Sequence, residues 1–266
     1  MLRNSVLTLN RPRHLCSSSG LISVLHSYST SPVVTWSSKH VYMDPYLLTH
    51  VQRSFLVPYF GLKSIINPER GDYVAGFGDA VVSERHLRAL HKRMLSNESG
   101  RFIMKTKPVI NEETLNLQAL RDLPTDTLGH EYMSFMDEHG FSPDERSKVR
   151  FMKDSELAYV MARYRQAHDF WHVLSGLPIS ILGEVSLKWF EFSALSLPSC
   201  ALSGLLGPLR MNTHERRLLR KEYIPWAMRA GGNCGDLLGY DYVNNMHKST
   251  DEVRQELNFE KFRTSN

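Results

Sequence analysis

Two histidines and two acidic residues lie close together in this sequence, at spacings that could hold one divalent metal ion. His168 and His172 are four residues apart, so on a helix they lie one turn apart on the same face. Asp169 lies about 100° around the helix axis from His168 and about 60° from His172. Glu184 follows twelve residues after His172. Imidazoles combined with carboxylates are typical ligands of zinc, iron or manganese rather than calcium, so the pattern predicts a metal site formed by these four residues.

A helical hairpin would bring the fourth residue to the other three. Apolar residues recur at helical spacing and predict a long helix that begins near residues 154–155 and ends before Gly176. Pro178 is then expected to start a second helix, which contains Glu184. At about 1.5 Å of rise per residue, His172 lies about 6 Å before Gly176, and Glu184 lies about 9 Å past Pro178. Two antiparallel helices joined by a short turn would therefore place the two side chains at similar heights.

Helical patterns dominate the remainder of the sequence. Apolar residues at spacings of three and four predict helices after Ser83, before Gly140 and after Asn212, and a final short helix within residues 249–262. Strand-like alternation of polar and apolar residues is hard to find. The sequence therefore predicts a single all-α domain over residues 35–266.

The first 34 residues differ from the rest in composition. They are rich in arginine and serine, and no acidic residue occurs before Asp44. Such a composition is typical of a mitochondrial or plastid transit peptide, whereas a secretory signal would need an unbroken apolar core. A disordered tail without a targeting role is the alternative. We expect residues 1–34 to be a disordered mitochondrial import signal.

Charge and cysteine content argue against several other classes of protein. The net charge of +4 comes from the basic residues that precede Asp44, and beyond that point basic and acidic residues are equal in number. This balance argues against a nucleic-acid-binding protein. Cys16, Cys200 and Cys234 have neither CxxC spacing nor that of a disulfide framework, which favours a reducing compartment. No apolar run is long enough to span a bilayer.

An uncharged stretch over residues 192–209 is followed by a basic one over residues 210–221. Prolines interrupt the first stretch, which could line a slot for an apolar ligand, lie on a bilayer, or form an ordinary helix–helix core. The basic residues could contact anionic lipid head groups, or form a solvated helix face.

The sequence leaves alternatives to the metal site open. The two histidines could have no ligand role, and Asp169 could form a buried ion pair with Arg165 one turn earlier. Four protein ligands make a closed, structural zinc site, whereas a carboxylate outside the ligand shell leaves a position for substrate. The His168-Asp169 dyad is also typical of phosphohydrolases of the HD type. Those enzymes need a further histidine and aspartate, for which His130 and Asp236 are conceivable.

The segment HDFWHVLSGLPISILGE, residues 168–184, fits the pattern His-Asp-x-x-His, eleven residues, Glu. With FMKDSELAYVMARYRQAHD before it, GEVSLKWFE at its end and LPTDTLGHEYMSFM further upstream, it resembles the coenzyme Q (ubiquinone) biosynthesis family represented by the fourth Coq protein. The resemblance covers about residues 45–260.

This resemblance implies an all-helical protein bound peripherally to the matrix side of the mitochondrial inner membrane, which organises the other ubiquinone-biosynthesis enzymes in one complex. It also implies a carbon–carbon lyase that removes the C1 carboxyl of 4-hydroxy-3-methoxy-5-polyprenylbenzoate, with hydroxylation at that carbon. By resemblance, the zinc ligands are His168, Asp169, His172 and Glu184, with iron or manganese as other metals. We expect Asp169 or Glu184 to assist as a catalytic base when it is not fully ligated.

The same resemblance sets the expected partners: the other pathway enzymes, the polyprenylated benzoate lipid and the membrane surface. A homo-oligomer is left open, and the charge balance predicts no nucleic-acid partner. The main alternative is a lipid-binding scaffold with a structural zinc ion and no chemistry of its own.

Overall fold

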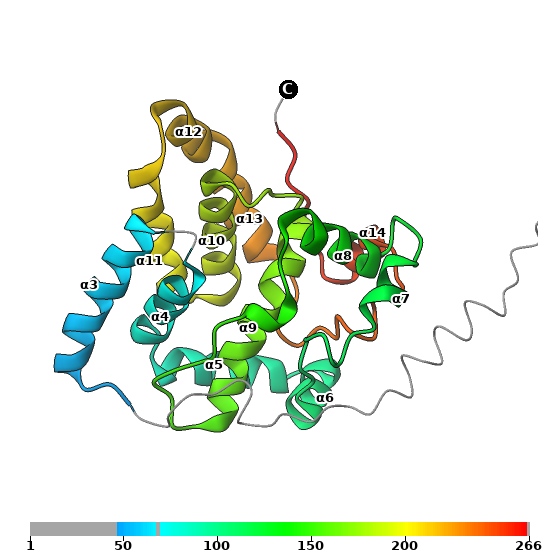
Figure 1. Cartoon of the computed structure of the whole chain (residues 1–266), viewed down its shortest axis with the longest axis horizontal. Helices are drawn as coiled ribbons and strands as arrows, with labels where there is room; N and C mark the ends of the chain where they lie inside the picture. Colours follow the sequence, from blue (N-terminus) through cyan, green and yellow to red (C-terminus); the bar gives the residue numbers. More distant parts are fainter. Residues whose placement is uncertain (1–46, 68–69, 265–266) are drawn as a thin grey trace, which may run out of the picture. The chain divides into compact units, whose positions relative to one another are not determined.

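The computed structural model describes residues 47–67 and 70–264, and this part of the chain is a single, all-helical domain (Figure 1). Within those residues, β-type pairing is confined to isolated bridges, such as the one between Thr127 and Ser249, and no strand is present. The all-α prediction is therefore confirmed. The import signal predicted for residues 1–34 lies outside the described residues.

The helices follow one another, most of them through short connections. In chain order they are α3 (His50–Ile66), α4 (Gly71–Val81), α5 (Glu84–Leu95), α6 (Glu98–Thr106), α7 (Leu117–Arg121), α8 (Leu128–His139), α9 (Ser155–Ser175), α10 (Ile181–Leu195), α11 (Pro198–Leu206), α12 (Thr213–Leu218), α13 (Ile224–Asn233) and α14 (Thr250–Glu256). The 3₁₀ turns η1 (Pro143–Glu145) and η2 (Gly207–Arg210) and the π-helical turn η3 (Leu219–Tyr223) lie between them. The longest connections lie between α8 and α9 and between α13 and α14. The helices predicted after Ser83, before Gly140 and after Asn212 are α5, α8 and α12, and the predicted final helix is α14.

Helix α9 runs through the middle of the domain and is buried on nearly all sides (Figure 1). The Asp154 carboxylate accepts hydrogen bonds from N–H groups of the first turn and so caps the N-terminus. Gly176 ends the helix with a φ of 73°, a conformation that glycine adopts without strain. Trp171 has no exposed surface. Because the helix is enclosed in this way, the backbone that carries His168 and His172 is held firmly in place.

The turn between α9 and α10 differs in one detail from the prediction. Helix α10 begins at Ile181 rather than at Pro178, because the Ser180 hydroxyl accepts a hydrogen bond from the Gly183 N–H and caps the helix there. A Cβ atom on Gly183 would lie only 1.9 Å from the Pro178 carbonyl oxygen, so only glycine permits this tight turn. The turn is therefore longer than expected, and it places Glu184 in the first turn of α10.

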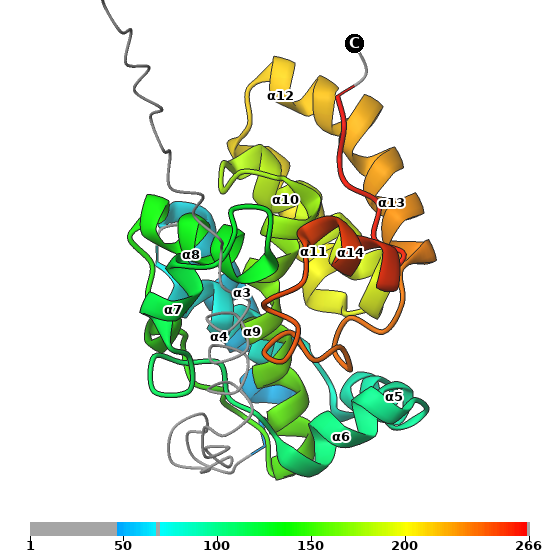
Figure 2. The same ribbon diagram turned by 90° about the vertical axis from the view of Figure 1, so that its right-hand side faces the viewer.

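The other helices enclose α9 and α10. Helix α9 packs against α5 and α8, whereas α10 packs against α11 and α13, and α3 packs on the outer side of α4 (Figure 1). The C-terminal segment runs along α13 (Figure 2), where the ring of Phe262 stacks on Tyr223 with centroids 4.2 Å apart. The backbone N–H of Phe262 donates to the Ser175 carbonyl, so this segment also fastens the end of α9. Within the described residues, no helix combines the length and the apolar character needed to cross a bilayer.

Candidate metal centre

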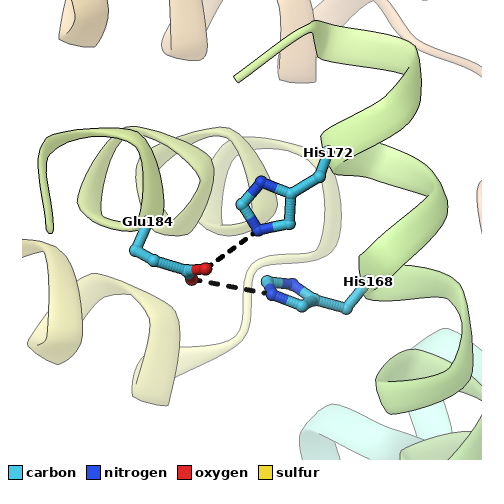
Figure 3. Close-up of side chains that lie close together, drawn as sticks. All are labelled: His168, His172 and Glu184. Atoms are coloured by element: carbon cyan, nitrogen blue, oxygen red, sulfur yellow. Dashed lines mark ion pairs between the residues drawn. The ribbon is translucent and has the colours of Figure 1, made fainter. Parts of the chain in front are cut away.

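His168, His172 and Glu184 converge on one point between α9 and α10 (Figure 3). Each residue offers a ligand atom that lies within 4.8 Å of the other two. Nε2 of His172 is 3.0 Å from Glu184 Oε1, and Nε2 of His168 is 3.6 Å from Glu184 Oε2. The histidine rings are nearly perpendicular, with centroids 4.9 Å apart. The fold therefore brings together three of the four side chains that were predicted to bind metal.

His172 is fixed on the sides that face away from Glu184. Its side chain is 1% exposed, its Nδ1 lies 3.0 Å from the Leu177 carbonyl oxygen, and the ring of Phe135 on α8 stacks on it with centroids 5.5 Å apart. Nε2 is buried and makes no hydrogen bond to any described residue, although Glu184 Oε1 lies close by. Burying a polar atom without a hydrogen bond is costly. A nitrogen held in this way is suited to bind a cation at the centre of the cluster.

His168 is oriented by Glu191, a residue that the sequence prediction did not include. Its Nδ1 lies 2.6 Å from Glu191 Oε1. Glu191 follows seven residues after Glu184 on α10, which is about two helical turns, so both carboxylates project from the same face of that helix. Glu191 is fully buried, and its other oxygen accepts a hydrogen bond from Lys188 Nζ at 2.8 Å. The spacing was visible in the sequence, but it does not reveal that Glu191 reaches a histidine of another helix.

Contacts between these carboxylates and their partners change the pKa values of the cluster. Burial and Lys188 favour neutral His168, but Glu191 and Glu184 outweigh both and raise the pKa of His168 to about 9. Burial would raise the pKa of Glu191, yet Lys188 and His168 lower it to about 2. The two histidines, against the effect of burial, hold the pKa of Glu184 well below its usual range. At neutral pH and without metal, both carboxylates are therefore ionised, and His168 is the positively charged imidazolium with a proton on each ring nitrogen.

Asp169 does not join this cluster, because its carboxylate is bound by Arg146. Two nitrogens of Arg146 lie 2.6 Å and 3.2 Å from Asp169 Oδ2, and the guanidinium also donates to the Tyr132 hydroxyl and to two backbone carbonyls. The alternative ion pair between Asp169 and Arg165 is not formed either. Arg165 binds the buried carboxylate of Asp79 instead. Arg146 lies before α9, and Arg165 lies on α9 but binds Asp79, far away in the sequence. Neither pairing could therefore be predicted from helical spacing.

The residues that an HD-type phosphohydrolase would need lie elsewhere. His130 Nδ1 contacts the Arg121 carbonyl oxygen at 3.0 Å, and Asp236 accepts a hydrogen bond from the Asn97 side chain at 2.8 Å. Neither residue belongs to the cluster of potential ligands. The geometry therefore gives no support to a phosphohydrolase.

The donor set of the cluster suits a divalent cation. Two imidazole nitrogens and one carboxylate are a common ligand set of catalytic zinc, in which a further position stays open for water or substrate. The buried Nε2 of His172, which faces the Glu184 carboxylate without forming a hydrogen bond to it, gives this fit a structural basis. The side chain of Glu184 is 37% exposed, so the cluster can be reached from solvent. His168, His172 and Glu184 are the residues that would hold the ion.

The affinity for zinc should depend on pH through His168. Because the pKa of His168 is about 9 in the metal-free protein, zinc must displace a proton from this residue at any lower pH. The apparent affinity should therefore rise about tenfold per pH unit between pH 7 and 9, and level off above pH 9. Chelator competition at several pH values, with the protons released on binding counted, measures this slope. A flat profile would contradict a role for His168 as a ligand.

The fold and this cluster describe a class of protein: an all-helical domain with a centre of two histidines and a glutamate at the junction of two helices. The family model described as "Coenzyme Q (ubiquinone) biosynthesis protein Coq4" matches residues 42–263. The chain therefore belongs to the Coq4 family and has a role in ubiquinone biosynthesis, as its sequence motifs predict.

Curated relatives agree with this assignment. The ubiquinone biosynthesis protein coq4, mitochondrial, of Schizosaccharomyces japonicus is 42% identical over 210 residues, which are 79% of this chain and 88% of the relative. The homologue from Aedes aegypti, also named mitochondrial, is 37% identical over 80% of this chain and 77% of its own length. A crystal structure from Nostoc punctiforme, of a protein described as a candidate for ubiquinone biosynthesis, has the same fold. It is 20% identical, with a TM-score of 0.61 over 77% of this chain and 97% of that chain.

Proposed function

We propose that this protein is a metal-dependent carbon–carbon lyase that removes the C1 carboxyl of 4-hydroxy-3-methoxy-5-polyprenylbenzoate. The observation that carries the proposal is the convergence of His168, His172 and Glu184 in a chain that belongs to a ubiquinone-biosynthesis family. A bound zinc ion would supply a positive charge for the carboxylate or phenolate of the substrate. Glu184 is the partly exposed carboxylate of the cluster, so it is placed to take the phenol proton when it is not fully ligated.

In the reaction, the bond between C1 and the carboxylate breaks, CO₂ leaves, and the bonding electrons stay on C1. A proton can then take this position. In the oxidative form, one oxygen atom of O₂ takes it instead and the other leaves as water, for which two electrons must come from a reductant. Zinc has no redox chemistry, so the oxidative form needs another metal or a partner enzyme to activate O₂, and a redox partner in the pathway to supply these electrons.

A scaffold with a structural zinc ion is the competing function, and Glu184→Gln distinguishes the two. Glutamine keeps the size and shape of the Glu184 side chain, which is 37% exposed, so we expect this variant to stay folded. The enzyme should lose activity by roughly 10² or more, and the carboxylated intermediate should accumulate. Mass spectrometry of that lipid and co-purification of the other pathway enzymes are the measurements.

The control for this variant is Glu138→Gln, which makes the same change at an exposed position of α8. It should leave the level of the carboxylated lipid intermediate and the co-purification of the other pathway enzymes as in wild type. If Glu184→Gln kept normal activity, or lost assembly and activity together, the scaffold would be the better description.

We further propose that the protein acts in mitochondria, on the matrix side of the inner membrane, together with the other enzymes of the pathway. The outer face of α3 supports a membrane-bound location. Five apolar side chains on it are exposed by between 49% and 72%: Val51, Phe55, Tyr59, Leu62 and Ile66. Leu205 and Leu209, from the uncharged stretch, are also more than 60% exposed, on α11 and η2. Exposed apolar surface of this extent is characteristic of interaction sites.

Charge favours a lipid surface as the partner. Neither α3 nor the segment from α11 to η2 contains an acidic residue, whereas Lys63 and Arg210 lie on them. Two such faces on two copies of the chain would place like charges together, but an anionic bilayer complements them. A polyprenylated substrate would be met in that bilayer.

Binding to vesicles tests this face. We expect Phe55→Ser with Leu62→Ser to weaken binding to phosphatidylcholine vesicles that contain an anionic phospholipid by at least about tenfold. Leu95→Ser, at an exposed position of α5, should have no effect. Unchanged binding of the double variant would exclude the outer face of α3. A dimer in solution that the double variant dissociates would instead assign the face to a second copy.

A further inference from the structure

Glu191 is a fully buried carboxylate that contacts His168 on the side away from the candidate metal centre. A buried charge is strongly unfavourable unless hydrogen bonds and an opposite charge compensate it. Glu191 receives both. Oε2 accepts hydrogen bonds from the Tyr164 hydroxyl at 2.5 Å, from Lys188 Nζ at 2.8 Å and from Cys200 Sγ at 3.3 Å. Three donors thus fix one oxygen, and the other oxygen is left for His168.

The remaining contact determines which nitrogen of His168 faces the cluster. Glu191 Oε1 lies 2.6 Å from Nδ1 of His168, and a carboxylate can only accept, so Nδ1 carries the proton. Nε2 is the nitrogen that lies toward Glu184, at 3.6 Å. A neutral His168 in this tautomer presents the lone pair of Nε2 to the position of the ion.

Both histidines are fixed through Nδ1, but by different groups. Nδ1 of His172 faces the neutral carbonyl of Leu177, whereas Nδ1 of His168 faces the carboxylate of Glu191. A carboxylate behind an imidazole makes it a more basic ligand than a carbonyl does. His172 is also confined by the ring of Phe135, but His168 is 20% exposed. His168 is therefore the ligand that depends more on its hydrogen-bonding partner.

We propose that Glu191 is a positioning residue, which holds His168 with Nε2 directed at the metal, and that Lys188 and Tyr164 hold Glu191 in place. This inference rests on the proposed metal site. It adds a buried layer to the three ligands, and it explains why a carboxylate and a lysine are buried side by side at this depth.

Two double variants test the proposal without leaving a buried charge unpaired. Lys188→Met with Glu191→Met removes the acceptor for His168, and Lys188→Met with Glu191→Gln keeps an acceptor oxygen of similar size. We expect zinc affinity to fall by about 10- to 100-fold in the first variant and by clearly less in the second. Chelator competition gives the affinities, and long-range ¹H–¹⁵N spectra of the zinc-loaded proteins show which nitrogen of His168 is protonated.

The matched control replaces another buried ion pair, by Asp79→Leu with Arg165→Met. Asp79 is as deeply buried as Glu191 but contacts none of the three ligands. Either of two results would contradict the proposal. In the first, this control lowers zinc affinity as much as the Glu191→Met variant does. In the second, both Glu191 variants bind zinc like wild type, with Nδ1 of His168 still protonated. Wild-type protein that binds no zinc would overturn the metal site and this inference together, whereas equal binding by wild type and variants overturns the inference alone.

Discussion

Replacing His172 with alanine is expected to abolish stoichiometric zinc binding and to stop ubiquinone synthesis at an intermediate that still carries its ring carboxyl group. His172 contributes the most deeply buried of the three donor groups, and its Nε2 faces Glu184 Oε1 at 3.0 Å without forming a hydrogen bond to it. Without it, only His168 and Glu184 remain, and two donors do not hold zinc at cellular concentrations. Metal analysis of the purified protein and mass spectrometry of lipid extracts give the two results.

The histidine-to-alanine change also opens a cavity, so stability must be measured beside metal content. We expect a loss of about 2 kcal/mol, as for other large-to-small changes in a core. His130→Ala is the control, since His130 is partly buried on α8 and does not reach the cluster. It should leave zinc and ubiquinone unchanged. Normal ubiquinone in the His172→Ala protein, or a nucleotide phosphatase activity that His130→Ala removes, would refute the proposed function.

Local sequence patterns predicted the long helix and the position of the histidines well. The Asp154 cap, the Gly176 stop and the four-residue spacing of His168 and His172 are all local signals, and each is present in the structure. The placement of Glu184 beside the histidines also followed from the spacing, although the start of α10 was misplaced. Pro178 suits a first helical position, but the Ser180 side chain makes the capping hydrogen bond and therefore decides where the helix begins.

The parts that could not be predicted depend on contacts between segments far apart in the sequence. Asp169 lies beside His168 in the chain, yet its carboxylate is bound by Arg146, 23 residues earlier, in the segment after α8. Glu191 has no feature in the sequence that distinguishes it from a surface glutamate, because side chains that surround it come from α9 and α11. The exposed apolar face of α3 was also missed, because nothing local shows which of its two apolar faces would pack on α4.

Asp169→Ala is expected to destabilise the metal-free protein by about 3 kcal/mol, because it leaves the guanidinium of Arg146 with an unpaired charge in a largely buried place. The side chains of this pair are only 16% and 19% exposed. Asp137→Ala is the matched control: it breaks an arginine–aspartate pair with Arg121 whose side chains are 37% and 49% exposed, and should cost less than about 1 kcal/mol. Denaturant unfolding of the two metal-free variants measures the difference.

The same variant decides whether Asp169 is a fourth ligand or a partner of Arg146. Because the ion pair holds the carboxylate outside the cluster, we expect the folded Asp169→Ala protein to bind zinc within about tenfold of wild type. Arg146→Met with Asp169→Leu should restore part of the lost stability, since an apolar pair replaces the buried charges but leaves the Ile110 and Pro143 carbonyls without their donor. The opposite result would make Asp169 a ligand: Asp169→Ala loses zinc but leaves the stability of the metal-free protein unchanged, and the double variant does not restore zinc binding. The ion pair between Asp169 and Arg146 would then have to open when the metal enters.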